Sequence, residues 1–206
     1  MPRHQFSVIV IICAVYLTSC SPAPSVKSSE PDSPLFSEEI QIALNHERNL
    51  LHGEMDNPVY LEILHAADEK KTTLTPESIR QLDEQWSQTN PKDVLAQTLL
   101  NSACSNELRS FRAAHPEFAE IFITDSQGRN VCLTNKTSDY YQADEAWWIN
   151  THNSNDPYGL YSPIEFDESS STESISLFLP VLDPLTGNKL GILKAVVKLS
   201  HLAEGL

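Results

Sequence analysis

Apolar residues recur at helical spacing through the first half of the folded region. Ile40, Leu44 and Leu51 lie four and seven residues apart, which places them on one face of a helix. Residues that cap helices precede the periodic stretches at four places, and these residues are Ser37, Asn57, Thr75 and Asn90. The pattern predicts four or five helices within residues 37–115 that share one core. The further core positions are Leu61, Leu64, Val94, Leu95, Thr98 and Leu99.

Beyond Pro116 the pattern changes to alternation and short apolar runs, which predict β-strands. Gly128 and Gly187 stand where hairpin loops need a residue with positive φ, so the first two and the last two strands are expected to pair antiparallel. Pro180 has no N–H for a strand ladder, which predicts an edge position or a bulge there. The five predicted strands are residues 118–125, 130–135, 159–166, 174–182 and 189–199.

Helices followed by an antiparallel sheet make the fold class α+β. We expect the N-terminal helices to pack beside a five-stranded antiparallel sheet, with residues 36–115 as the helical part and residues 116–206 as the sheet part. Residues 137–158 are too long for a simple connection, and long ordered loops in compact domains usually carry function. A short helix that carries Trp147 and Trp148 is expected within this loop.

The N-terminus has the architecture of a secretory signal peptide. A basic start at Arg3 is followed by an apolar run over residues 8–17 that is too short to span a bilayer comfortably. The run ends in Leu17-Thr-Ser-Cys20, which resembles a bacterial lipobox, where the cysteine is acylated and becomes the new N-terminus. Residues 1–19 are therefore predicted to be a lipoprotein signal peptide, and residues 20–35 the lipidated Cys20 and a flexible, proline-rich tether.

Lipidation would anchor the chain to the cell envelope on its periplasmic face. Simple secretion and an uncleaved anchor are the alternatives. Ser21, directly after the cysteine, favours the outer membrane if the organism is Gram-negative.

The formal charge of the chain limits the kinds of partner that it is expected to bind. Removing residues 1–19 takes away one of the 14 basic residues and none of the 28 acidic ones, so the mature chain has a formal charge of about −15. Nucleic acid and anionic lipid headgroups would be repelled, whereas a cationic ligand is compatible with this charge. We expect no enzyme activity, because the chain has no Gly-x-Ser-x-Gly elbow, no phosphate loop and no compact Ser/His/Asp pattern. No metal site and no cofactor are expected either.

Three phrases follow the first predicted hairpin in a fixed order. They are Thr137-Ser-Asp-Tyr-Tyr-Gln-Ala-Asp-Glu-Ala-Trp-Trp148, Glu165-Phe-Asp-Glu-Ser169 and Leu179-Pro-Val-Leu-Asp-Pro-Leu-Thr-Gly-Asn-Lys-Leu-Gly191. With that hairpin, they resemble the extracytoplasmic Cache (PAS-like, PDC-type) sensor domains of bacterial receptors over most of residues 116–200. The resemblance implies a long N-terminal helix beside a sheet whose other face holds a small-molecule ligand under a loop. We find no transmitter segment in the chain, so a separate membrane receptor or kinase is the expected signalling partner.

The candidate ligand site combines aromatic and acidic side chains. Six of the sixteen aromatic residues fall between Tyr140 and Tyr161. Aromatic walls with a few acidic groups suit an organic cation, through cation–π contact and charge pairing. The alternative is that one tryptophan merely closes the core while the tyrosines hydrogen-bond across the loop. The candidate ligand-binding residues are Tyr140, Tyr141, Asp144, Glu145, Trp147, Trp148, Tyr161 and Asp167.

Two departures from the Cache pattern bear on the charge of the ligand. Many amino-acid-binding members carry an Arg two residues before a Trp-aromatic pair and an Asp in the last strand. Glu145 stands in the position of that Arg, and Val196 stands where the Asp would fall. Tyr161, in contrast, matches a position at which the family often presents a pocket tyrosine. Because the usual carboxylate clamp is absent, a neutral or cationic ligand is predicted.

Two interpretations of function follow. The leading one is a lipid-anchored sensor module that binds a small molecule and signals through a separate partner. The alternative is a non-sensing envelope lipoprotein that uses the same fold as a protein-interaction scaffold. A closed pocket lined by Tyr141, Trp147, Tyr161 and Asp167 would favour the first, and a pocket filled by the packing of these residues would favour the second.

Two cysteines remain once Cys13 is removed with the signal peptide and Cys20 is acylated. Cys104 lies on the last helical stretch and Cys132 in the second strand, and both would enter an oxidising compartment. A disulfide between them would join helix to sheet. Buried free thiols are the alternative.

Overall fold

The computed structural model describes residues 35–70, 75–167 and 171–204, without the side chains of Asp167, Ala203 and Glu204. The predicted signal peptide, the lipidated Cys20 and nearly all of the tether lie outside this part of the chain. Within the described ranges, no helix has both the length and the apolar character needed to cross a membrane.

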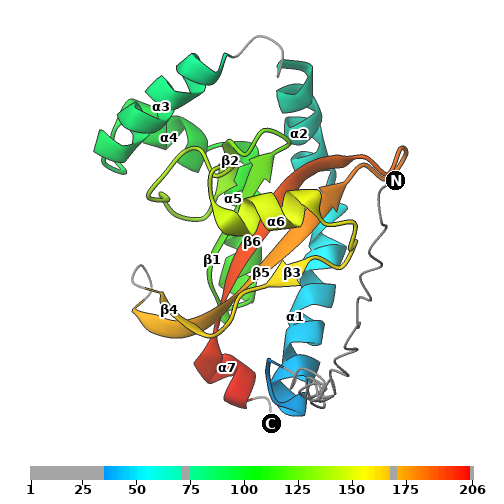
Figure 1. Cartoon of the computed structure of the whole chain (residues 1–206). Coiled ribbons are helices and arrows are strands. Elements are labelled where there is room, and N and C mark those ends of the chain that lie inside the picture. The colour runs from blue at the N-terminus through cyan, green and yellow to red at the C-terminus, as the bar shows by residue number, and fades with distance from the viewer. Residues whose placement is uncertain (1–34, 71–74, 168–170, 205–206) are drawn as a thin grey trace, which may run out of the picture. The chain divides into compact units, whose positions relative to one another are not determined.

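The described residues form an α+β fold, as predicted (Figure 1). Its helices are α1 (Glu38–Met55), α2 (Pro58–Lys70), α3 (Pro76–Gln88), α4 (Val94–Leu100), α5 (Ala103–Ala114), α6 (Ala146–Asn153) and α7 (Leu199–Glu204). Its strands are β1 (Phe118–Asp125), β2 (Asn130–Leu133), β3 (Leu160–Tyr161), β4 (Glu165–Asp167), β5 (Thr172–Leu182) and β6 (Lys189–Lys198).

Three of the four predicted caps begin helices. The side chains of Ser37, Asn57 and Thr75 accept hydrogen bonds from backbone N–H groups in the first turns of α1, α2 and α3. Asn90 instead opens a turn in which its backbone N–H donates to the Asp93 carboxylate over 2.8 Å, and α4 begins only after that turn. The predicted helix start at Asn90 is therefore wrong by one turn.

The sheet is antiparallel throughout and has the strand order β2-β1-β6-β5-β3, with β4 paired to the start of β5. The prediction of five strands is wrong by one, because the predicted strand at 159–166 is divided into β3 and β4. Pro163 lies between these two strands, and a proline has no N–H to continue a ladder. The other four predicted strands match β1, β2, β5 and β6 to within two residues at each end.

The hairpin turns and the proline in β5 also follow the sequence. Gly128 and Gly187 have φ of +81° and +73°, as predicted for hairpin loops. Pro180 pairs with Ile192 of β6, while the pairing of β5 with β3 ends at Phe178. In the described part of the chain, Pro180 therefore lies where β5 has a partner on one side alone, which agrees with the predicted edge position.

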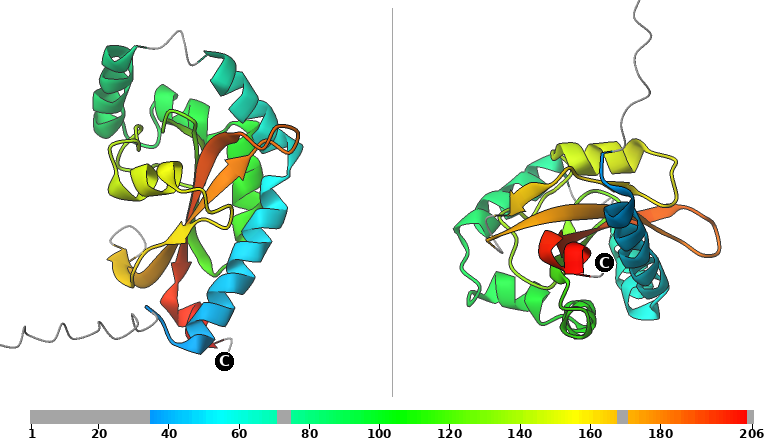
Figure 2. Two further views of the ribbon diagram at one scale, coloured as in Figure 1. Left: turned by 45° about the vertical axis from the view of Figure 1, so that its right-hand side comes forward. Right: turned by 90° about the horizontal axis from the view of Figure 1, so that it is seen from below.

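The two faces of the sheet have different partners. We call the face that packs on α1, α2 and α5 the closed face, and the face that α6 covers the α6 face. Figure 2 shows α6 on one side of β5 and β6, and α1 and α5 on the other. The side chains of the closed face belong to the main hydrophobic core, and its strand residues include Ile121, Ile123, Ile175, Leu177, Leu179, Val181, Leu193, Ala195 and Val197. Alternation in β5 is confirmed, because Ile175, Leu177, Leu179 and Val181 all lie in this core.

A second, smaller core lies where α3 and α4 meet the strands β1 and β2. Trp86, Ala96, Phe122 and Leu133 form it. Val94, which was predicted to be a core residue, is 83% exposed. The helices therefore divide between two cores instead of sharing one, because α3 and α4 pack beside the α6 face.

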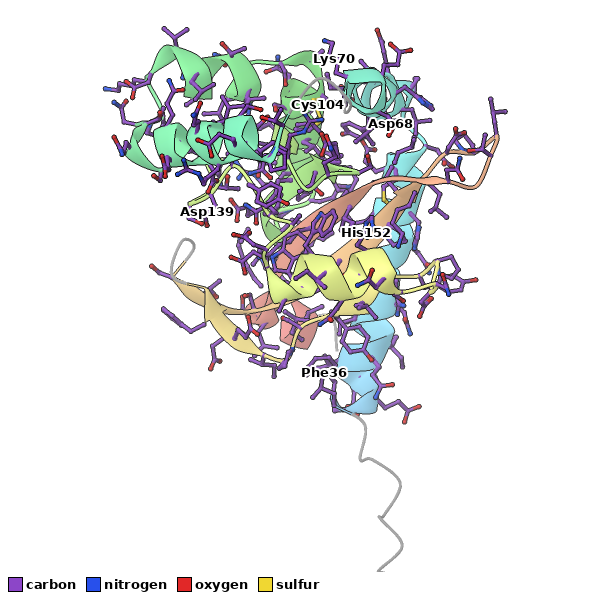
Figure 3. All side chains as sticks on the ribbon, turned by 45° about the horizontal axis from the view of Figure 1, so that its top comes forward. Phe36, Asp68, Lys70, Cys104, Asp139 and His152 are labelled. Carbon is purple, nitrogen blue, oxygen red and sulfur yellow. A yellow bond between two sulfur atoms is a disulfide. The ribbon has the colours of Figure 1, made fainter. Side chains whose placement is uncertain are left out.

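A disulfide joins Cys104 of α5 to Cys132 of β2, with 5.4 Å between the two Cα atoms. Figure 3 labels Cys104 on its helix. The bond ties a helix of the closed face directly to the sheet.

Candidate functional site

The loop before α6 is ordered because it pairs with the first hairpin. The backbone N–H of Asn130 donates to the carbonyl of Tyr140 over 3.0 Å, and the N–H of Gln142 donates to the carbonyl of Gly128 over 2.7 Å. One carboxylate oxygen of Asp83 in α3 accepts from the N–H groups of both Tyr140 and Tyr141, at 2.8 and 2.9 Å. These bonds fix the point at which α6 begins.

The two adjacent tryptophans of α6 point to different surroundings, since neighbouring residues lie about 100° apart around a helix. Trp148 is 6% exposed, and its indole N–H donates to the Thr124 hydroxyl on the sheet over 3.0 Å. Its ring stacks on His152, one turn further along α6, with 4.5 Å between the ring centroids. Trp147 instead stacks on Phe178 of β5, with centroids 5.1 Å apart and planes 16° apart.

A single row of paired residues crosses the sheet beneath Trp147. The row is apolar except at its centre, where β6 contributes Lys194 between two phenylalanines. The row consists of Leu133, Phe122, Lys194, Phe178 and Leu160. A central strand that is covered by a helix is an unusual place for an ammonium group.

The ammonium of Lys194 lies among three aromatic rings. Its nitrogen is 5.2 Å from the ring centroid of Trp147, 5.7 Å from that of Phe122 and 5.9 Å from that of Phe178. All three distances fall within the usual limit for cation–π attraction. The aromatic surface that the sequence predicted for a ligand cation therefore already contacts a cation of the protein.

A cavity of about 350 Å³ lies beside this lysine, between the N-terminal end of α6 and the strands β3, β4 and β5. Rings form much of its wall, and hydroxyl, amide and carboxylate groups complete it. The residues around it are Glu145, Ala146, Trp147, Asn150, Leu160, Tyr161, Ser162, Pro163, Glu165, Ser176, Phe178 and Lys194. We call this cavity the α6 pocket.

A larger cavity of about 620 Å³ lies on the other side of α6, against α3. Tyr141, Asp144 and Trp148 line it together with Arg80 and Asp83. Its charges are largely satisfied within the protein, because Asp83 accepts two backbone N–H bonds and Arg80 forms ion pairs with Glu77 and Glu84. Burial raises the pKa of the Tyr141 phenol, and the carboxylates of Asp144 and Asp125 raise it further.

The candidate residues predicted from the sequence therefore divide among several environments. Glu145, Trp147 and Tyr161 meet in the α6 pocket, while Tyr141, Asp144 and Trp148 line the cavity beside α3. Tyr140 packs against Trp86 in the second core, with ring centroids 6.0 Å apart, and burial raises the pKa of its phenol. Asp167 lies in β4, and its side chain is outside the described part.

Sequence reasoning missed the residues that the sheet contributes to the α6 pocket, above all Lys194 and Phe178. One signal was present, since Lys194 is the single charged residue in the apolar run 191–197. Its significance depends on the strand register that places Phe122 and Phe178 beside it.

Among the described residues, no group of three His, Cys, Asp or Glu side chains is placed to hold a metal ion.

No family model and no curated protein matches the chain. Solved structures with similarity to it include the ligand-binding domain of the Campylobacter jejuni chemoreceptor Tlp3 in complex with 4-methylisoleucine. That domain is 13% identical, with 82% of this chain and 63% of that chain covered and a TM-score of 0.41. The ligand-binding domain of the Pseudomonas aeruginosa amino acid chemoreceptor PctC, in complex with GABA, is 14% identical, with 81% and 61% covered and a TM-score of 0.40.

The sensor domain of Escherichia coli DcuS is also similar, at 14% identity, with 73% of this chain and 96% of that chain covered and a TM-score of 0.36. The chain thus spans less than two thirds of each chemoreceptor domain, at 63% and 61% of their lengths. Two of these similar structures are ligand-binding domains of chemoreceptors, and the third is a sensor domain.

Proposed function

We propose that the protein is a lipid-anchored extracytoplasmic sensor module that binds a small organic molecule in the α6 pocket. A separate membrane receptor or kinase would then respond to the bound state. The pocket itself is the observation that carries the proposal. Its volume of about 350 Å³ lies in the range of small-molecule sites, and its wall combines three aromatic rings with six polar or charged side chains that could orient a ligand.

The attachment of α6 suggests how binding would be reported. The Lys189 ammonium donates to the carbonyls of Thr151, His152 and Ser154 over 2.8, 2.7 and 3.1 Å, so it holds the C-terminal end of the helix. At the other end, the N-cap residue Glu145 makes no side-chain capping bond. A ligand in the pocket would contact this N-terminal end of α6, next to the loop whose backbone N–H groups donate to Asp83 of α3.

Two features support an extracytoplasmic location and a lipid anchor. The disulfide between Cys104 and Cys132 is typical of proteins in oxidising compartments. The sequence that ends at Cys20 resembles a lipobox, and a proline-rich segment follows it.

A thermal-shift screen tests the ligand site, since a compound that binds the folded state raises its melting temperature. We would screen amines, carboxylates and sugars against the wild type and Asn150→Trp. Asn150 is an exposed residue of α6 at the pocket, so the indole would occupy the pocket without disturbing the core. Asn153 is also exposed on the same helix but does not line the pocket, so Asn153→Trp is the matched control.

The proposal predicts compounds that stabilise the wild type and the control but not Asn150→Trp. A screen in which no compound stabilises the wild type would contradict ligand binding. Compounds that stabilise all three proteins equally would contradict the location.

The lipid anchor has its own test. Cys20→Ala should abolish acylation and release or misprocess the protein, whereas Cys13→Ala, within the signal peptide, should leave membrane partitioning unchanged. Detergent phase partitioning and the mass of the mature N-terminus report the outcome. A Cys20→Ala protein that still partitions fully with membranes would contradict the anchor.

A protein-interaction scaffold is the second candidate, and exposed apolar side chains favour it. Phe166, Ile164 and Tyr161 are 64%, 44% and 41% exposed on and between β3 and β4. Exposed apolar surface of this kind often marks a contact with another protein. If Phe166→Ser weakened association with an envelope partner while no small molecule bound, this second function would replace the first.

A further inference from the structure

We propose that the α6 pocket takes a small organic monoanion, with Lys194 as the residue that pairs with its charge. This inference rests on the proposed function and adds the chemical class of the ligand. It reverses the preference for a neutral or cationic ligand that the sequence predicted.

The first observation is that no carboxylate in the described ranges forms an ion pair with Lys194. It is half-buried, and the described part of the chain offers its ammonium no ion pair and no hydrogen bond. The other two lysines of β6 differ, because Lys189 donates to three carbonyls and Lys198 donates to the carbonyl of Pro116 over 2.6 Å. A partly desolvated charge without a partner costs free energy, and an anion that reaches it offsets that cost.

The second observation is that the aromatic rings stabilise the lysine without neutralising it. Trp147, Phe122 and Phe178 surround the ammonium at 5.2 to 5.9 Å, which tolerates a cation but leaves its N–H donors unpaired. A ligand cation would have to displace Lys194 from these rings and would be repelled by it. A carboxylate would instead form charge-assisted hydrogen bonds with the same ammonium.

The third observation limits the ligand to one negative charge. Glu145 and Glu165 also line the pocket, and both are exposed. A second anionic group on the ligand would approach these carboxylates and be repelled, whereas a neutral or positively charged group would not. The ligand class is therefore a molecule with one anionic end at Lys194 and an apolar body against Trp147 and Tyr161.

Matched compounds of equal shape and different charge test this directly. We would measure melting temperatures and calorimetric Kd values of the purified protein with benzoate, benzamide and benzylamine, and with hexanoate, hexanamide and hexylamine. Adipate, the dianion that corresponds to hexanoate, tests the role of the two glutamates. Acids should bind, amides and amines should bind weakly or not at all, and adipate should bind more weakly than hexanoate.

Three variants assign the effect to Lys194. Lys194→Met should weaken acid binding about ten- to a hundredfold, the range for a hydrogen bond to a charged group. Lys194→Arg retains the charge and should keep most of the affinity. Lys136→Met is the matched control, because the Lys136 ammonium lies 4.9 Å from the ring centroid of Trp86, outside the pocket, and should not change binding.

The melting temperature of ligand-free Lys194→Met shows whether the substitution impairs folding. It should equal or exceed that of the wild type, since an apolar side chain suits the aromatic surroundings. If amines or amides bound most tightly and their binding persisted in Lys194→Met, this inference would be overturned and the proposed function would remain intact. The absence of binding by any compound here or in the broader screen would overturn both.

Discussion

The two faces of the sheet are formed by the same strands but differ in how closely they are packed. On the closed face, β6 contributes Leu193, Ala195 and Val197 to a continuous apolar core with α1, α2 and α5. On the α6 face, the alternate residues of the same strand include Lys194, and a cavity of about 350 Å³ lies beside it. Two consecutive residues of β6 therefore face different surroundings: Leu193 lies in the closely packed core, and Lys194 lies beside the cavity.

This difference indicates where stability and binding are located. A core that is fully packed resists change, because even one missing methylene group is felt. A half-buried lysine beside a cavity contributes little to stability, and its ammonium remains available to pair with a ligand. The closed face thus holds the fold together, and the α6 face is where we propose that a ligand binds.

The largest expected effect comes from the disulfide that ties α5 to β2. Removing it with Cys104→Ala and Cys132→Ala should lower the free energy of unfolding by roughly 3 to 4 kcal/mol in the chain-entropy model. Urea unfolding of wild type and double variant measures the difference. Mass spectrometry of the alkylated, unreduced wild type is the control, and two labelled thiols there would mean that no bond forms.

Neighbouring residues of β6 offer the sharpest comparison of the two faces. Leu193→Ala should cost about 3 kcal/mol, because it opens a cavity in the main core. Lys194→Met, one residue later, should change the free energy of unfolding by less than about 0.5 kcal/mol or raise it. Equal destabilisation by both changes, measured by urea unfolding, would contradict the distinction between the faces.

The two tryptophans of α6 separate packing from ligand contact. Trp147→Ala should cost about 2 kcal/mol through the lost stack on Phe178, and it should remove stabilisation by ligand. Trp148→Phe should cost about 1 kcal/mol, since it loses the hydrogen bond to Thr124, but it should keep the ligand-induced shift. Thermal melts with and without a stabilising compound measure both. If Trp148→Phe alone abolished the shift, the ligand would lie in the cavity beside α3.

The smallest effect is expected at Glu47 of α1, which carries a half-buried carboxyl group. One carboxylate oxygen of Glu47 is buried, and no residue of the described ranges forms a hydrogen bond with it. Burial raises the pKa of this carboxyl, and nearby Glu117 raises it further, against opposing effects of His46 and His115. Because the folded state holds the proton more tightly, the stability contribution of this group is present at low pH. It is lost as the pH rises from about 4.3, the unfolded pKa, through the higher folded pKa.

Glu47→Gln should therefore raise the free energy of unfolding at pH 7 by about 0.5 kcal/mol, a small value because solvent screens the partly exposed side chain. The gain should decrease as the pH falls through the unfolded pKa and vanish at about pH 3, where the wild-type carboxyl is protonated in both states. Urea unfolding of both proteins at about pH 3 and pH 7 checks this. A gain that is equal at the two pH values would assign it to packing instead of charge.

Local patterns in the sequence were sufficient to predict most of the secondary structure. The alternation of Ile175 and Leu177 with Ser176 and Phe178 placed β5 correctly, and the cap at Thr75 placed the start of α3. The division of the predicted strand at Pro163 was missed, although the proline that interrupts the ladder is visible in the sequence.

The candidate site could be predicted only in part, because its parts come from distant segments. The aromatic and acidic loop was visible, but the start of α6 at Ala146 sends Trp147 and Trp148 into different surroundings. Lys194 is separated from Phe122 by 72 positions in the chain, and the two become neighbours only through the register of β1 and β6. The amino-acid composition does not reveal the register of these two strands.

A crystal structure with the most stabilising acid from the matched sets shows where the acid binds and which group its charge faces. We expect the anionic group within about 3 Å of the Lys194 ammonium, with the apolar body against Trp147 in the α6 pocket. An acid bound in the cavity beside α3, or in the α6 pocket with its charge turned away from Lys194, would contradict this expectation.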